Sequence, residues 1–104
     1  APVLIITTFV RDRSGYDKDG TPSNELGNLW GAYDLGLHNE NLLLKARELG
    51  LDTLVMGIRD ADAIRSMLHI PEQEIIVSVI SVGYRAIQPE KPKRKALEEI
   101  VTYY

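Results

Sequence analysis

The residues best suited to chemistry form a basic cluster near the C-terminal end of the chain. Lys91, Lys93, Arg94 and Lys95 place four cations within five residues of a chain whose formal net charge is −3. Such a cluster on a Pro-stiffened arm can hold a phosphate, and the planar guanidinium of Arg94 can do so through two parallel hydrogen bonds. A solvated tail that aids solubility explains the same charges, and on charge alone it is the simpler explanation.

A second candidate site lies where a short apolar run, Leu54-Val55-Met56-Gly57, meets the start of a helix. Ligands of α/β proteins often bind at the carboxyl ends of strands, where free backbone N–H groups point outward. Gly57 would let a ligand approach the backbone closely. An ordinary strand-to-helix turn accounts for the same residues, and no Gly-rich phosphate-binding fingerprint accompanies them.

The remaining reactive residue types indicate neither a metal site nor a nucleophile. His38 and His69 share no metal-ligand spacing; His69 is expected to cap a helix end, and His38 to lie on a helix surface or be buried with its hydrogen bonds satisfied. The chain has no Cys, which excludes disulfides, thiolate zinc ligands and a Cys nucleophile. Ser78 and Ser81 lie in a strand without a nearby His. The catalytic residues therefore stay unknown.

Composition limits the class of protein. With 44% hydrophobic and 26% charged residues among 104, the chain is expected to fold as a single domain over residues 1–104. Its net negative charge argues against nucleic acid or an anionic membrane as the main partner. No apolar run reaches the roughly 18 residues of a membrane span, and the absence of Cys fits a cytoplasmic protein. A strand that begins within two residues of Ala1 suggests a fragment or a processed chain.

The first half of the chain predicts a strand, a long loop and a long helix. Residues 3–10 are apolar and β-branched enough for a central strand, whereas 11–27 are charged and interrupted by Gly and Pro. From residue 28 to Gly50 no Pro occurs and apolar residues repeat at helical spacing. This helix is expected to be capped by Asn24 or Asn28, to end at Gly50, and to be buried against two partners.

The second half predicts a strand, a short helix and two more strands. Residues 51–57 are expected to form a buried strand, followed by a helix that Asp60 caps and Ile70-Pro71 ends. An apolar face on that helix is expected from Ile64, Met67 and Leu68. Residues 75–82 are nearly all apolar and predict a central strand, and 97–104 predict another strand after an extended arm with Pro89 and Pro92.

This order of elements resembles the C-terminal half of the FMN-dependent nitroreductase family, and iodotyrosine deiodinases have a similar pattern. The resemblance covers essentially the whole chain and rests on the joint order of four pieces. These are the opening Ala1-Pro2-Val3-Leu4-Ile5, the helical stretch from Trp30 through Asp34 and Asn41-Leu42-Leu43-Leu44 to Leu49-Gly50-Leu51, His69-Ile70-Pro71 followed by Ile75-Ile76-Val77 and Val82-Gly83-Tyr84, and Lys93-Arg94-Lys95-Ala96-Leu97-Glu98-Glu99.

The resemblance implies an α+β fold, a nitroreductase-like mixed sheet flanked by helices, of which this chain is only the C-terminal half. It also implies an intertwined homodimer with FMN at the interface and the C-terminal strand reaching across to the partner. Arg94 would be the main FMN phosphate ligand, with Lys93 and Lys95 as neighbours. Val55, Met56 and Gly57 would lie against the isoalloxazine ring, with backbone N–H groups toward its N5 and O4 edge, and Leu54 would support them.

Three departures from the family pattern accompany the resemblance. The N-terminal Arg-Ser-x-Arg type of motif, which holds the phosphate and ring, has no counterpart in this chain. Ala96 stands where a Pro is common, and His69 where a Gly is common. Residues 11–27 are shorter than the lid region of the larger members.

The leading functional hypothesis is an FMN flavoprotein that passes electrons from NAD(P)H to a small-molecule acceptor, such as a nitro compound or quinone, by ping-pong reduction. The alternative is a non-enzymatic α/β dimerisation or anion-binding module built from half of the same fold. Nucleic-acid binding ranks third, because it would need more basic charge with interleaved aromatic residues.

Overall fold

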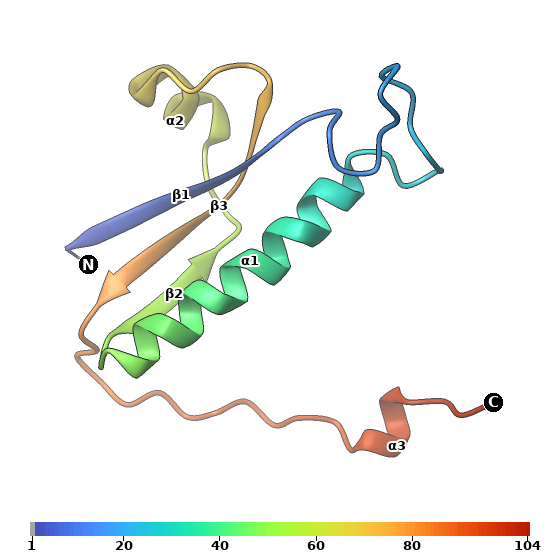
Figure 1. Cartoon of the computed structure of the whole chain (residues 1–104). Coiled ribbons are helices and arrows are strands. Elements are labelled where there is room, and N and C mark those ends of the chain that lie inside the picture. The colour runs from blue at the N-terminus through green and yellow to red at the C-terminus, as the bar shows by residue number, and fades with distance from the viewer. Residues whose placement is uncertain (1) are drawn as a thin grey trace.

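The computed structural model describes residues 2–104, which form a small antiparallel sheet with one long helix beside it and an extended C-terminal arm (Figure 1). Ala1, the first residue of the stretch that resembles the family's mid-chain strand, lies outside the described residues. In chain order the elements are β1 (Val3–Val10), α1 (Leu29–Glu48), β2 (Asp52–Met56), α2 (Ala61–Leu68), β3 (Glu74–Gly83) and α3 (Leu97–Ile100).

The sheet has the order β1-β3-β2, and both pairings are antiparallel. The prediction that β3 is central is confirmed, because it pairs on both sides and contains the fully buried Ile80. The prediction that β1 is central is wrong for this chain, since β1 lies at one edge. The prediction that β2 is buried is also wrong, because β2 forms the other edge of the sheet and its Leu54 and Val55 stay exposed.

Helix α1 packs against β1 and β2 and so covers one face of the sheet. Ala46 and Gly31 are buried on its inner side, and the ring of Phe9 lies so close to Gly31 that any Cβ there would clash with it. Gly50 follows the helix with φ +79°, the left-handed conformation expected of a residue that ends a helix. Asn28 is the N-cap residue, although its side chain bonds to Asp12 instead of capping the helix.

The expectation that α1 is buried against two partners is not met within this chain. Its outward face exposes a stripe of large apolar side chains, Leu29, Tyr33, Leu37 and Leu44. The sheet can cover only one side of a helix, so an apolar stripe on the opposite side needs a surface from elsewhere.

Helix α2 begins as predicted at Asp60, whose Oδ1 accepts a hydrogen bond from the backbone N–H of Ala63 at 3.0 Å. It ends at His69, which adopts the left-handed conformation with φ 55° and is the expected cap residue. Its predicted apolar face is only partly buried, because β3 is the main element that contacts this short helix and Met67 stays 75% exposed.

The C-terminal arm leaves the end of β3 and runs away from the sheet in extended conformation, as its two prolines predict (Figure 1). Every residue from Tyr84 to Ile100 is exposed. The predicted strand at 97–104 is wrong: residues 97–100 form one helical turn, α3, closed by a hydrogen bond from the Ala96 N–H to Glu99 Oε2 at 2.7 Å. An apolar stretch needs a paired neighbour to become a strand, and no described strand lies beside this one.

The core of this chain is small. Its buried apolar residues are Ala46, Ile76, Val79 and Ile80, and the buried Thr7 and Ser78 hydroxyls share a hydrogen bond of 2.7 Å across β1 and β3. Within residues 2–104, no helix combines the length and the apolar character that a bilayer crossing requires.

Candidate functional site

The first predicted site, at the end of β2, is accessible. Leu54 and Val55 are 61% and 47% exposed, Met56 is half-buried, and Gly57 is exposed just after the strand. Because side chains alternate along a strand, Val55 faces the side of α1, where it lines a cleft with Leu43, whereas Leu54 faces the opposite side of the sheet. The end of this edge strand therefore offers apolar side chains on both faces.

Gly57 leaves open space and a free backbone donor at this point. A Cβ added to Gly57 would meet no atom within 4 Å. The N–H groups of Gly57 and Ile58 donate no hydrogen bond to another residue among 2–104. A ligand edge that carries hydrogen-bond acceptors can therefore approach this backbone without displacing protein atoms.

Arg59 holds this turn in place. Its Nη2 donates to the Ile76 carbonyl on β3 at 2.8 Å, and its Nη1 donates to the Gly57 carbonyl at 3.4 Å. One side chain thus ties the segment after β2 to the central strand. No carboxylate lies within ion-pair distance of Arg59 among residues 2–104, so its charge is not neutralised by the described chain.

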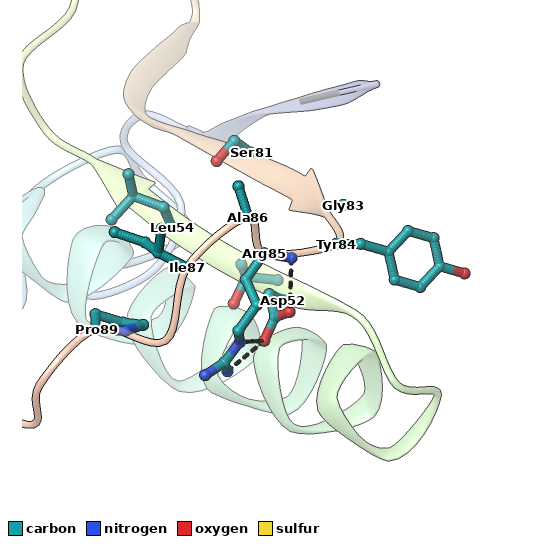
Figure 2. A pocket seen from close by; sticks show the side chains of 10 residues that line it. Asp52, Leu54, Ser81, Gly83, Tyr84, Arg85, Ala86, Ile87 and Pro89 are labelled. Carbon is teal, nitrogen blue, oxygen red and sulfur yellow. Dashed lines mark hydrogen bonds and ion pairs between the residues drawn. The ribbon is translucent and has the colours of Figure 1, made fainter.

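A second cleft lies where the arm leaves the sheet. Figure 2 shows Ile87 lying near Leu54 and Ala86 near Ser81, on the face of the sheet that Leu54 occupies, while the Tyr84 ring points away. The arm therefore partly covers the outer face of β2 before it turns outward.

An ion pair fixes the start of the arm at this cleft. Asp52, the first residue of β2, accepts hydrogen bonds from the Arg85 backbone N–H at 3.0 Å and from Arg85 Nε at 2.8 Å, and a further contact from Nη2 (Figure 2). Arg47 at the end of α1 also reaches Asp52, with Nη1 and Oδ1 3.2 Å apart. The side chains of Asp52 and Arg85 are 22% and 34% exposed, so the pair is partly shielded from solvent.

This ion pair shifts the pKa of Asp52 and the pKa of Arg85. The side-chain hydrogen bonds from Arg85, helped by its backbone N–H and by the charges of Arg85 and Arg47, hold the pKa of Asp52 below its ordinary value. The same carboxylate raises the pKa of Arg85. Asp52 and Arg85 therefore both stay ionised at neutral pH. Through its contacts with Arg47 and Arg85, Asp52 joins the start of β2 to the end of α1 and to the base of the arm.

The second predicted site, Lys93, Arg94 and Lys95, lies far along the exposed arm. Arg94 Nη1 donates to the Pro92 carbonyl at 3.1 Å, and none of the three cations forms an ion pair with residues 2–104. Within one copy of the described chain, this basic cluster and the end of β2 are not brought together, because the arm leads away from the sheet.

The histidines lie away from both sites. His38 is exposed on α1 with its Nδ1 3.3 Å from Asn39 Oδ1, and His69 ends α2. No three His, Cys, Asp or Glu side chains among residues 2–104 gather as metal ligands.

Sequence reasoning missed three residues that organise these sites: Arg59, Asp52 and Arg85. The Asp52–Arg85 pair spans 33 positions, and only the antiparallel pairing of Asp52 with Gly83 brings it together. The sequence offered one signal for this pair. An Asp stands at the first position of an edge strand, and an Arg follows shortly after the strand that pairs with it. For Arg59 the only signal was a long cation next to Gly57.

The chain belongs to the nitroreductase family, whose family model, described as "Nitroreductase family", matches residues 1–84. Among its relatives, an Archaeoglobus fulgidus protein named for NADH dehydrogenase/NAD(P)H nitroreductase is 38% identical over 55 residues, which is 49% of this chain and 32% of that protein. A Bacillus subtilis protein, MhqN, which is named for NAD(P)H nitroreductase, is 35% identical over 63 residues, 59% of this chain and 31% of that protein. The matched parts thus span about a third of the length of these curated relatives.

Solved structures give the same family assignment for the fold. A nitroreductase family protein from Clostridium difficile has a TM-score of 0.76 at 27% identity and covers 99% of this chain and 59% of its own. A Streptococcus pneumoniae family member has a TM-score of 0.71 at 21% identity, over 86% of this chain and 42% of its own. The predicted α+β, nitroreductase-like fold, of which this chain forms a part, is therefore confirmed.

Proposed function

We propose that this chain is part of an FMN-dependent oxidoreductase that transfers electrons from NAD(P)H to a small-molecule acceptor such as a nitro compound or a quinone. The family assignment and the names of the two relatives support an oxidoreductase of the nitroreductase type. The observation on which the proposal rests is the end of β2, where Gly57 combines open space with an unused backbone N–H.

The residues at the end of β2 fit the ring of a flavin. In the proposal Val55 and Met56 pack against the isoalloxazine ring, and the free N–H of Gly57 donates to its N5 and O4 edge. Leu54, on the same face of the sheet as Met56 and opposite Val55, supports the strand. When bound, FMN supplies the two-electron chemistry, while these residues orient the ring and exclude water from it.

The basic cluster on the arm fits the phosphate of the same cofactor. Arg94 is proposed as the main phosphate ligand with Lys93 and Lys95 beside it, and this is supported by the absence of ion pairs to these cations within residues 2–104. Because the arm points away from β2 in a single copy, the complete site needs a further part of the fold or a second subunit.

A homodimer is proposed to supply that second subunit. The exposed apolar stripe on α1 and the exposed Leu97, Ile100 and Tyr103 of the arm are surfaces that a second copy could cover. Flavin would then lie at the interface, between the edge strand of one subunit and residues that the partner brings to it.

The alternative is a non-enzymatic α/β dimerisation or anion-binding module. The exposed apolar stripe on α1 and the exposed cations of the arm support it, because neither surface needs a cofactor to bind a second copy or an anion. An exposed cluster of cations on a stiff arm would then bind anions without any redox role.

Flavin absorbance decides between the two. The purified protein is mixed with excess FMN, desalted and examined by its visible spectrum, and NADH or NADPH is then added without air. Bound flavin that is bleached by the nucleotide is expected. A folded protein that retains no flavin, yet is still dimeric or still binds inorganic phosphate, would contradict the enzyme proposal and favour the module.

A further inference from the structure

The C-terminal arm is fastened to the sheet at one place. Arg85, the second residue after β3, donates from its backbone N–H to Asp52 Oδ2 at 3.0 Å and from Nε to Asp52 Oδ1 at 2.8 Å. In the part of the chain that the structure describes, no residue from 86 to 104 forms a hydrogen bond or an ion pair with residues 2–83. Ile87 lies near β2 (Figure 2), but its side chain stays 75% exposed. The polar fastening of the arm therefore depends on Asp52 and Arg85.

This fastening fixes the direction of the arm as well as its position. The two oxygens of Asp52 accept from the backbone and from the side chain of Arg85, and hydrogen bonds from two groups of one residue leave it little freedom to swing. Asp52 itself is held in the sheet, where it pairs with Gly83. On the arm side, Arg85 Nη1 donates to Gln88 Oε1 at 2.6 Å, so the same guanidinium also binds the bend that follows. Asp52, Arg85 and Gln88 are called here the Arg85 clamp.

The arm beyond the clamp forms a stiff lever. Arg94 stands nine positions after Arg85, so an extended backbone between them spans at most about 30 Å. Pro89 and Pro92 lie between them, and each holds its φ angle at about −65°. A rotation of about 10° at the base would displace the far end of such a lever by about 5 Å. A charge-assisted hydrogen bond needs a separation of about 2.7–2.9 Å, so this rotation would break a phosphate contact.

We propose that Asp52 and Arg85 are positioning residues for the phosphate of the cofactor. The Arg85 clamp sets the direction in which the arm leaves the sheet, and it thereby places Arg94 where the phosphate binds. The phosphate role rests on the proposed function, because it needs FMN bound by Arg94. The locking of the arm does not, because it depends only on contacts within the chain. Neither Asp52 nor Arg85 touches the cofactor, and both act through the arm.

The direction of the arm is measured by the distance between two spin labels. The chain has no Cys, so Ser66→Cys on α2 and Glu98→Cys on the arm, both at exposed positions, provide the two labelling sites. Doubly labelled chains are diluted into excess unlabelled parent, so that the measured distance lies within one chain. The parent is expected to give one narrow distance distribution. Asp52→Ala and Arg85→Ala should each broaden it, and Asp52→Glu, which keeps the carboxylate, should restore part of it.

The positioning role is measured by flavin affinity. Asp52→Ala and Arg85→Ala should each weaken FMN binding about five- to thirty-fold, because a freed arm must be fixed again at one backbone position when the phosphate binds. Riboflavin lacks the phosphate and should bind both variants as it binds the parent. A substitution that only damaged the sheet would weaken both flavins alike. Because Arg85 lies outside the strands, Arg85→Ala decides the question if Asp52→Ala fails to fold.

Arg47→Ala is the matched control, because Arg47 Nη1 contacts the same Asp52 carboxylate at 3.2 Å from the end of α1 and not from the arm. It removes a charged partner of Asp52 and should leave the distance distribution and both flavin affinities unchanged. An unchanged narrow distribution in Asp52→Ala and Arg85→Ala would overturn the locking of the arm. Equal losses for FMN and riboflavin, or equal effects of Arg47→Ala and Arg85→Ala, would contradict the positioning role.

Failure of the proposed function is seen separately. A parent that retains no FMN, but whose arm is released by Asp52→Ala, would overturn the phosphate role together with the proposed function and would still establish the clamp as the lock of the arm. A parent that binds FMN, and whose variants release the arm without any selective loss of FMN, would overturn the positioning role alone.

Discussion

At the scale of single residues, Gly57 is the most direct test of the flavin site. Gly57→Val should abolish flavin retention, because the new side chain would occupy the space proposed for the ring edge. The fold should survive, since nothing in the described chain lies within 4 Å of a Cβ at this position and such a substitution costs about 1–3 kcal/mol. The measurement is the visible spectrum after desalting, together with circular dichroism to verify folding.

Gly36→Ala is the control for this substitution. Gly36 lies within α1, and a Cβ added there would also meet no atom within 4 Å, so it tests a harmless glycine replacement. Removing a helix-interior glycine should stabilise the protein by about 0.5–1 kcal/mol and leave flavin binding unchanged. A folded Gly57→Val variant that kept all of its flavin would remove the end of β2 from the proposed site.

Arg94 tests the phosphate half of the site. Arg94→Ala should weaken FMN binding about ten- to a hundred-fold, because a charge-assisted hydrogen bond contributes about 1.5–3 kcal/mol. Riboflavin lacks the phosphate and should bind the variant and the parent equally. Titrations followed by flavin fluorescence measure both affinities, with Lys18→Ala in the distant loop as the control. Equal losses for FMN and riboflavin would indicate ring contact or misfolding, and no loss would leave Arg94 a solvated cation.

At the scale of elements, the Asp52–Arg85 pair should make the anchoring of the arm depend on pH. The hydrogen bonds from Arg85 lower the folded-state pKa of Asp52, so the carboxylate stabilises the fold above the ordinary Asp pKa of about 3.9. That contribution is lost as the pH falls through the lowered folded-state pKa. Asp52→Asn should therefore unfold at lower urea concentration than the parent near neutral pH, and the difference should shrink at strongly acidic pH.

Asp62→Asn is the comparison for that experiment, because Asp62 lies in the first turn of α2 and forms no ion pair with residues 2–104. Its effect on the urea midpoint should be smaller than that of Asp52→Asn near neutral pH. If the difference in urea midpoint between the parent and Asp52→Asn stayed constant from neutral to strongly acidic pH, the Asp52 charge would not contribute to the stability of the fold.

Local sequence signals predicted the elements well, but they did not predict what covers them. The cap at Asp60, the helix end at Gly50 and the central position of β3 follow from residues a few positions apart. The burial of β2 did not follow, because burial depends on neighbours that a local pattern cannot show. The same limit explains why an apolar stretch at 97–104 predicted a strand where the structure has a helical turn.

The same limit separates the candidate-site residues that the sequence could indicate from those that it could not. Gly57 and Arg94 could be singled out from residue type and position. Arg59 and the Asp52–Arg85 pair could not, because their partners lie 17 and 33 residues away and depend on the pairing of β2 with β3.

At the scale of the whole molecule, the chain exposes many large apolar side chains, whereas few apolar residues are buried in its core. Large apolar side chains are exposed along α1, at the edge strands and on the arm. A chain that matches part of a larger family fold is expected to leave such surfaces for other parts of that fold or for a second subunit. The arm is the segment that extends farthest from the sheet, so it is the segment best placed to reach a partner (Figure 1).

Deletion of residues 97–104 should therefore convert the proposed homodimer into a monomer. Leu97, Ile100, Tyr103 and Tyr104 are exposed, and burying such side chains contributes about 25 cal/mol for each Å² of apolar surface. The sheet should be unaffected, because residues 97–100 are exposed on the arm, away from the sheet, and Arg85 still anchors its base. Sedimentation velocity measures the assembly, and circular dichroism verifies the fold. Tyr33→Glu on the exposed face of α1 is the companion variant. A dimer that survived the deletion and dissociated in Tyr33→Glu would place the interface on α1, and the arm would then be free of the role proposed for it.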